Sequence, residues 1–277
     1  MRSKRCLPAV LFSVLACAQP PRNDLIREGA QLDLDGKTAE AKSMFQKAID
    51  TAAGPAARAG AQRAMAMSWA FEGNCAKTTE YENQVIDYWK TQEAASPGNA
   101  FYQEGEMADE AARVCIDYGN LDAAYDLYKR GHDAGMKEPG IPPGRKAVWD
   151  FRWEHAQARI AARRGNKAEA ARHVARAVAI LDDLKQKDAA LYQQQSAFVP
   201  YLTGYVALYT GDYKTAVQDL DKASQNDAFV QCLLGMAYEK LGDEANATAA
   251  YRKAFDAARG HNPPAAFARP FARKKLS

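Results

Sequence analysis

The sequence of 277 residues contains only 18 glycines and 12 prolines, and it has no uninterrupted apolar run of about 18 residues. The low glycine and proline content excludes collagen-like chains and Pro/Gly-rich disordered chains, and it argues against an all-β sandwich. The lack of a long apolar run predicts that no internal segment spans a membrane. Alanine, the strongest helix former, makes up about a fifth of the residues, which favours an all-α fold.

The sequence also lacks the motifs of common enzymes and metal sites. It has no H-E-x-x-H, no G-x-S-x-G, no G-x-G-x-x-G and no C-x-x-C pair, and its four histidines are scattered. No candidate nucleophile has a visible base beside it. We therefore expect a protein that is not an enzyme, without catalytic residues, a metal site or a cofactor.

Positive and negative residues are equal in number once the first five residues are left out of the count. Lysine and arginine total 37 against 34 aspartates and glutamates, and Arg2, Lys4 and Arg5 account for the net charge of +3. A protein that binds nucleic acid needs a concentrated basic face to neutralise phosphates. The bulk composition offers no such face, so we expect no nucleic-acid partner.

The first eighteen residues have the three parts of a secretory signal. Three basic residues precede an apolar stretch that includes Leu7–Val14, and small residues follow at 16–18. Cleavage after Ala18, within an A-x-A site, would release a soluble protein that begins at Gln19. Alternatively, Val14-Leu15-Ala16-Cys17 resembles a bacterial lipobox, and the resemblance implies lipidation of Cys17.

We favour the lipobox slightly, although a third alternative is an N-terminus that is never cleaved. The sequence predicts export, either to the periplasm or to a membrane surface as a lipoprotein. In the lipoprotein alternative, the only membrane contact would be the lipid anchor at Cys17.

The remaining chain repeats one pattern of small residues. An apolar, helix-like segment ends in glycine and a polar residue; alanine follows five residues after the glycine, and a larger residue follows four later. A further small residue stands seven positions before each glycine. The clearest instances are Gly36/Ala41/Phe45, Gly119/Ala124/Tyr128, Gly165/Ala170/Val174, Gly211/Ala216/Leu220 and Gly242/Ala247/Tyr251. Small residues at matching heights let two helices approach closely, and a glycine in the left-handed conformation can end the first helix.

The last unit carries a recognisable signature. It reads Leu234-Gly235-x-x-Tyr238, then Gly242-Asp243, then Ala247-x-x-x-Tyr251, and it resembles the tetratricopeptide repeat. The resemblance spans almost all of residues 19–260 and implies an α-solenoid of about six antiparallel helix hairpins. Successive loop glycines, including the poorer match at Gly73, are 37, 46, 46, 46 and 31 residues apart by subtraction, whereas the family unit has about 34 residues. Three units therefore have longer helices or longer connections.

The resemblance also implies a function, namely protein–protein interaction on the concave face lined by the first helix of each hairpin. The inward positions of two neighbouring units form an arginine row and a tyrosine stripe, and we expect them to bind a partner peptide. These residues are Arg152, His155, Arg159, Arg163, Tyr201, Tyr205 and Tyr209. The competing interpretation, which we favour on balance, is that the tyrosines fill the core and the arginines pair with Glu106 and Asp109. The Lys/Asn clamp by which some family members hold a C-terminal carboxylate is not reproduced.

A different function remains open. A helical array of this kind could bind a small ligand or glycan for an envelope enzyme, and such a site would need a closed pocket around Arg159 and Tyr205 rather than an open channel. The last segment, residues 261–277, is basic and is expected to be a flexible, solvated tail.

Three cysteines lie in the body of the chain. Cys75 and Cys115 are each about twenty residues from the reversal at Ser96-Pro97-Gly98, so antiparallel helices would bring them to one height. We hypothesise that they form a disulfide in an oxidising compartment, and two buried reduced thiols are the equal alternative. Cys232 is expected to be a small core residue.

Overall fold

A computed structural model describes residues 24–277 of the chain, and in these residues it contains helices and no strand. The expected signal segment 1–18, including Cys17, lies outside the described residues. Six pairs of antiparallel helices form hairpins, and two further helices, α9 (Ala189–Ser196) and α14 (Pro263–Leu276), lie outside these pairs. The pairs are α1 (Asp24–Asp35) with α2 (Thr38–Asp50), α3 (Pro55–Phe71) with α4 (Cys75–Lys90), α5 (Pro97–Asp117) with α6 (Leu121–Gly135), α7 (Pro143–Arg163) with α8 (Lys167–Lys187), α10 (Val199–Thr210) with α11 (Tyr213–Leu220), and α12 (Ala228–Leu241) with α13 (Glu244–Ala257).

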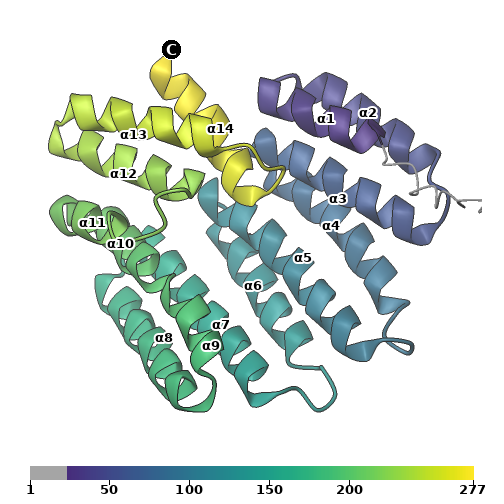
Figure 1. Cartoon of the computed structure of the whole chain (residues 1–277), viewed down its shortest axis with the longest axis horizontal. Coiled ribbons are helices and arrows are strands. Elements are labelled where there is room, and N and C mark those ends of the chain that lie inside the picture. Colours follow the sequence, from purple (N-terminus) through teal and green to yellow (C-terminus); the bar gives the residue numbers. More distant parts are fainter. Residues whose placement is uncertain (1–23) are drawn as a thin grey trace, which may run out of the picture.

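The hairpins stack in sequence order and form a solenoid, as predicted. Most helices pack against their neighbours along the chain, and Figure 1 shows the hairpins following one another around an arc from α1 to α13. Each hairpin leaves an apolar side that only the next hairpin covers, which is the reason repeats of this kind are stable as arrays. None of the helices in residues 24–277 is both long and apolar enough to cross a membrane.

The six loop glycines end the first helix of each hairpin in the expected way. All six have a positive φ, between 73° and 88°. This left-handed conformation suits glycine because it has no Cβ atom. The regular loop explains why the polar residue after each glycine so often begins the second helix; the side chains of Asn74, Asn166, Asp212 and Asp243, for example, accept hydrogen bonds from the backbone of that helix.

Small and large residues meet across the hairpins as the repeat pattern predicts. A Cβ atom added to Gly29, Gly204 or Gly235 would overlap the side chain of Phe45, Leu220 or Tyr251 respectively. In each case the glycine lies seven residues before the loop glycine, and its partner lies nine residues after it. The same register places Ala112 and Ala158, both fully buried, on the first helices of the third and fourth hairpins.

The longer spacing in the middle of the chain comes from helix length and from an insertion. Helices α5, α7 and α8 have 21 residues each, whereas α1 has 12. Residues 136–142 connect α6 to α7, and the short helix α9 separates α8 from α10. Pro200 lies in the first turn of α10, a position that tolerates proline because that N–H group has no partner within the helix.

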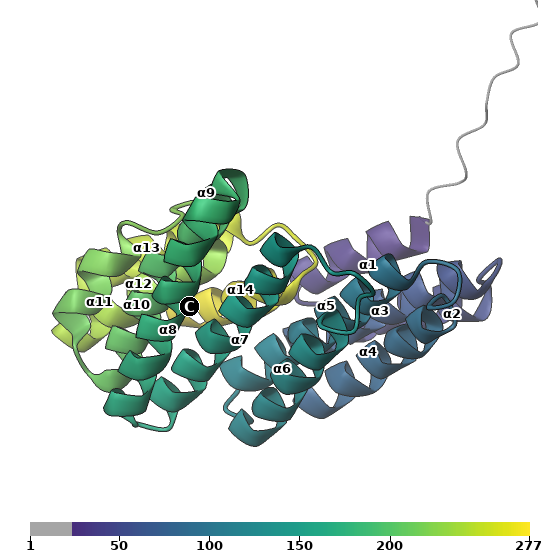
Figure 2. The ribbon, with the colours of Figure 1, turned by 90° about the horizontal axis from the view of Figure 1, so that it is seen from below.

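The C-terminal segment differs from the expected flexible tail. Residues 263–276 form helix α14, which packs against α12 and α13 at one end of the arc and against α3 and α5 at the other. In both views α14 lies between the first and last hairpins (Figure 1, Figure 2). Its apolar face is buried, and Phe267 packs against Phe229 with ring centroids 5.2 Å apart.

Basic residues of this segment are used internally. The Arg269 side chain donates to the carbonyl of Leu34, at 2.5 Å, and to the carbonyls of Phe255 and Ala258, both at 3.1 Å. Arg273 donates to the same Leu34 carbonyl at 2.7 Å. These carbonyls lie at or near the C-terminal ends of α1 and α13, where the last groups of a helix lack partners and the helix dipole favours a cation. The segment therefore joins the two ends of the solenoid.

Candidate functional site

The predicted arginine and tyrosine rows lie on adjacent first helices, as their spacing requires. Arg152, Arg159 and Arg163 come from α7, and the three tyrosines come from α10, which packs directly on α7. Two further residues of α5 and one of α6 join them. We refer to this group of side chains as the arginine–tyrosine cluster. Its members are Arg113, Asp117, Tyr128, His155, Arg159, Arg163, Tyr201, Tyr205 and Tyr209.

Most of the residues predicted to bind a partner are not accessible, which corrects the expectation of an open peptide-binding row. His155, Arg159 and Tyr201 are buried, and Tyr205 has no exposed surface at all. Tyr205 and Tyr201 belong to the same core cluster as Phe229 of α12. The competing interpretation, in which the tyrosines fill the space between hairpins, describes these positions correctly.

Arg152, at the edge of the arginine row, has the acidic partner expected from the interpretation in which the arginines pair with Glu106 and Asp109. Arg152 forms an ion pair with Glu106, and its guanidinium lies 4.9 Å from the centre of the Trp149 ring. Asp109 lies nearby, and burial raises its pKa to about 7 even though Arg152 acts in the opposite direction. Arg152 is therefore part of a local ion-pair network.

Arg159 at the centre of the cluster is held by phenols instead of carboxylates. Its guanidinium donates to the hydroxyl of Tyr128 at 2.7 Å and to that of Tyr201 at 3.3 Å. Burial acts to lower the pKa of Arg159, but the neighbouring tyrosines and Asp117 raise it, so the side chain stays charged. A buried charge without a carboxylate in hydrogen-bond contact is rare in folded proteins.

His155, next to Arg159 in the cluster, is neutral at physiological pH. Burial lowers its pKa well below the usual value, and the charges of Arg159 and Arg113 lower it further. Its ring lies 5.3 Å from that of Tyr201. The neutral ring can donate or accept one hydrogen bond at Nε2, which has no partner in the protein.

Arg163 lies at the more open edge of the cluster. Its guanidinium lies 4.6 Å from the centre of the Tyr209 ring and donates to the backbone carbonyl of Asp117 at 3.5 Å. Both Arg163 and Tyr209 are half-buried. This is therefore the less buried edge of the cluster.

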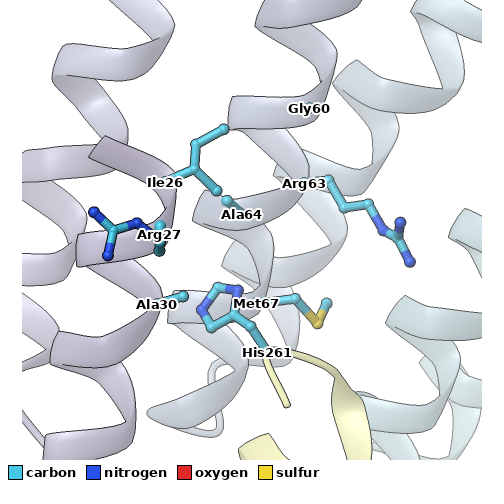
Figure 3. A pocket seen from close by; sticks show the side chains of 8 residues that line it. All are labelled: Ile26, Arg27, Ala30, Gly60, Arg63, Ala64, Met67 and His261. Carbon is cyan, nitrogen blue, oxygen red and sulfur yellow. The ribbon is translucent and has the colours of Figure 1, made fainter. Parts of the chain in front are cut away.

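A second feature of the inner face is a cavity of about 470 Å³ between α1 and α3. Its walls are mainly apolar, and Figure 3 shows the imidazole of His261 beside Met67 and Ala30, with Arg27 and Arg63 on opposite sides. The lining residues are Ile26, Arg27, Ala30, Gly60, Arg63, Ala64, Met67 and His261. Its volume lies within the range of about 300–1,000 Å³ found for ligand pockets, and its floor is apolar at Ala30, Ala64 and Met67.

The position of His261 in this cavity is fixed by a buried hydrogen-bond chain. Its Nε2 lies 2.8 Å from a carboxylate oxygen of Asp33, and the hydroxyl of Ser68 donates to the other oxygen at 2.9 Å. The ring lies between Phe45 and Phe71, with centroids 5.4 Å and 5.6 Å away. The link between α13 and α14 is thereby anchored to the first two hairpins.

Arg63 connects the cavity to a buried carboxyl group that the sequence analysis did not single out. Arg63 donates to both carboxylate oxygens of Glu110. Behind them, Glu82 is buried without a hydrogen-bond partner, and burial together with the charge of Glu110 raises its pKa well above the usual value. Glu82 stands nine residues after Gly73, at the position where other repeats have Phe45, Leu220 or Tyr251.

Cys75 and Cys115 are joined by a disulfide in the structure, and their Cα atoms are 4.7 Å apart. Cys75 begins α4 and Cys115 lies near the end of α5, so the bond ties two neighbouring hairpins together. Cys232 is a buried free thiol, as expected.

The disulfide can be tested by alkylation of the purified protein. Under denaturing, non-reducing conditions we expect Cys232 to be alkylated while Cys75 and Cys115 stay unmodified until a reductant is added. Because the bond closes a loop of 40 residues, the double substitution to serine should lower the free energy of unfolding by about 2–4 kcal/mol. Alkylation of all three thiols without reductant would show that the bond is absent.

No group of three or more histidine, cysteine, aspartate or glutamate side chains in residues 24–277 lies close enough to hold a metal ion. The sequence analysis missed the contributions of Asp117, Tyr128 and the cavity residues from α1. The spacing of Arg113 and Asp117, four residues apart on α5, was the available signal for the first of these.

Comparison with known proteins identifies one repeat directly. Residues 230–261, which cover most of α12 and all of α13, match the tetratricopeptide repeat family. No curated protein matches the sequence. The chain is similar to two crystal structures of the nearly identical TPR-like repeats of a Podosopora anserina protein assigned as a kinesin light chain, one of which carries a single substitution. Both show 14% identity and a TM-score of 0.38, and the matches cover 84% of this chain and 92% and 93% of the others.

Proposed function

We propose that the protein is a non-catalytic scaffold of the bacterial cell envelope, which binds a segment of another envelope protein on the inner face of its solenoid. The tetratricopeptide repeat at 230–261 and the stacked hairpins support a protein partner in general. The signal-like segment 1–18, with Cys17 as its lipidation site, supports export and a periplasmic or membrane-anchored location. A disulfide between Cys75 and Cys115 is compatible with that oxidising compartment.

The observation that carries the proposal is the cavity between α1 and α3. The cavity lies between the first helices of two hairpins, and in arrays of this kind the first helices line the inner face. It is open to solvent, and half of the side-chain surface of Arg63 in its wall is exposed. The arginine–tyrosine cluster is mostly buried, so it offers far less surface to a peptide. We therefore place the partner's contact at the N-terminal hairpins, with an apolar side chain inserted beside Ala64 and Met67.

A bulky residue at Gly60 tests this assignment. A Cβ atom at Gly60 would meet no other atom within 4 Å, so Gly60→Trp can fill the cavity without disturbing the core. We expect this variant to capture at least about tenfold less partner than the wild type, as measured by crosslinking and mass spectrometry in intact cells. Filling the cavity removes the space that the partner's apolar group would occupy.

Ala57→Trp provides the matched control. Ala57 is exposed on the same helix but does not line the cavity, so this variant carries the same bulk and should retain the partner. Both variants should keep the helical circular dichroism and thermal midpoint of the wild type. Equal capture by the two variants would contradict binding at the cavity.

One observation favours the second function, in which the helical array binds a small ligand or glycan for an envelope enzyme. That function requires a closed site around Arg159 and Tyr205, and both residues are in fact buried.

A further inference from the structure

Three arginines of the arginine–tyrosine cluster have no acidic partner. Within residues 24–277, Arg113, Arg159 and Arg163 form no ion pair, although Arg152 on α7 and Arg164 just after α7 each form one. Arg152 pairs with Glu106, and Arg164, directly after Arg163, pairs with Asp122. The difference therefore concerns the inner face of α5 and α7 and not arginines in general.

Aromatic rings hold these three guanidinium groups in place. Arg113 lies 5.2 Å from the centre of the Phe229 ring, Arg159 lies 5.3 Å from that of Tyr128, and Arg163 lies 4.6 Å from that of Tyr209. Stacking on a ring orients a guanidinium and leaves N–H groups at its edge free to donate. Arginines arranged in this way are suited to bind an oxyanion.

Several polar atoms of the cluster are buried and have no hydrogen-bond partner. They come from three different helices and include donors as well as acceptors. These atoms are Arg113 Nε, both carboxylate oxygens of Asp117, His155 Nε2, Arg159 Nε and the Tyr205 hydroxyl. Native proteins satisfy most of their buried polar groups, so a concentration of exceptions at one place indicates a site for a polar ligand.

The acidic residues near these arginines do not balance them. Asp117 lies near all three guanidinium groups but makes no side-chain hydrogen bond to them. Asp227 faces Arg113, but its carboxylate is engaged at the start of α12, where it accepts from the backbone N–H groups of Phe229 at 2.8 Å and Val230 at 3.4 Å. The cluster keeps an excess of positive charge in a poorly solvated region.

We propose that the arginine–tyrosine cluster binds a small oxyanion with two negative charges, of the phosphate or dicarboxylate type. Arg113, Arg159 and Arg163 supply the charge, and the Tyr205 hydroxyl and His155 Nε2 supply further hydrogen bonds. The ligand enters at the half-buried edge formed by Arg163 and Tyr209. The site is separate from the cavity between α1 and α3, so it does not depend on the scaffold proposal.

Titration of the purified full chain at pH 7 with sodium phosphate, sodium succinate or sodium chloride at matched ionic strength tests the proposal. We expect phosphate or succinate to raise the thermal midpoint in a saturable manner, with a dissociation constant below about 1 mM by calorimetry. Chloride should not do so. The stronger of the two oxyanions identifies whether the site prefers a phosphoryl or a dicarboxylate group.

Arg163, the last residue of α7, and Arg164, which follows it directly, give a matched pair of variants. Arg163→Gln should weaken binding of the preferred oxyanion at least about tenfold, because it removes a charged donor. Arg164→Gln should change it less than about twofold, since that side chain points to Asp122. Equal effects of the two substitutions, equal responses to chloride and the oxyanions, or no response to either oxyanion would overturn the proposal.

Tyr205→Phe gives an independent readout that keeps the arginines intact. It removes a buried hydroxyl without a protein partner, so the thermal midpoint without oxyanion should be equal to or higher than that of the wild type. The same variant should bind the oxyanion several-fold more weakly. Unchanged oxyanion affinity would exclude Tyr205 from the site and count against a ligand at the centre of the cluster.

Discussion

A chain that ends at Gly260, and so lacks α14, is expected to lose at least about 5 kcal/mol of unfolding free energy, a large part of the roughly 5–15 kcal/mol that stabilise a typical domain. The truncation removes the buried Phe267 and the alanines of the same face, and it uncovers Phe229 and Leu34. Burial of one large apolar side chain contributes about 1.5–3 kcal/mol, and several are affected at once. Urea denaturation followed by circular dichroism measures the change.

Lost hydrogen bonds add to this effect. Without Arg269 and Arg273, the Leu34 carbonyl at the end of α1 loses both of its side-chain donors. A chain that ends at Arg273 is the appropriate control, because it keeps these bonds and loses only the exposed ion pair of Lys275 with Glu239 and the partly buried Leu276. Its free energy of unfolding should stay within about 2 kcal/mol of the wild type. Similar denaturation midpoints for the 260 truncation and the full chain would show that α14 does not close the solenoid.

The regular part of the fold could be predicted because it depends on local spacing. A glycine that must adopt positive φ, an alanine five residues later and a large residue after that define each hairpin by themselves. The pairs Gly29–Phe45 and Gly235–Tyr251 meet in the structure at the predicted register. The last unit, which follows this spacing together with the Leu-Gly-x-x-Tyr signature, is also the one that the family comparison identifies.

The fate of the C-terminal segment could not be read from its composition. Its arginines and lysines suggest a solvated end, but two of those arginines bind carbonyls of helices that lie about 11–240 residues away in the sequence. Such partners are known only when the arc of hairpins brings the first and last repeats near each other. One local signal was present: Asn262 followed by two prolines is a typical helix start, and the Asn262 side chain does accept from the backbone of Ala265.

The inner face shows the same limit. The spacing correctly placed Arg159 and Arg163 on one helix face and the three tyrosines on the next, because residues four apart share a side of a helix. Whether that face is open depends on residues from other hairpins, such as Tyr128 of α6 and Phe229 of α12, which cover it. Periodicity predicts the direction of a side chain but not what packs over it.

Glu82 illustrates a local exception to the repeat. The position nine residues after the loop glycine holds a large, mostly apolar side chain in the other repeats, and in this repeat it holds a carboxyl group that is buried and has a raised pKa. The poor match of the Gly73 unit to the pattern was thus informative. It marked the hairpin in which the core next to Arg63 and Glu110 is polar.

Substitution of Trp149 by alanine is expected to lower the free energy of unfolding by about 3–5 kcal/mol, the usual range for a buried tryptophan. The indole is only 1% exposed and lies against Gly105 of α5 and Gly135 of α6, where an added Cβ atom would overlap it. The indole, which belongs to α7, therefore holds α5, α6 and α7 together. Gly105 and Gly135 have no side chains that could move into the space left by the ring, so a cavity would remain.

Trp153→Ala, one turn further along α7, is the control that separates this packing effect from the loss of any tryptophan. Trp153 is half-buried and makes an edge-to-face contact with Tyr125 and a tilted contact with His132, so its removal should cost about 1–2 kcal/mol. Urea denaturation of both variants gives the comparison. A loss at Trp149 no larger than that at Trp153 would mean that the glycine-lined notch relaxes when the ring is removed, and that the close approach of α5, α6 and α7 does not depend on it.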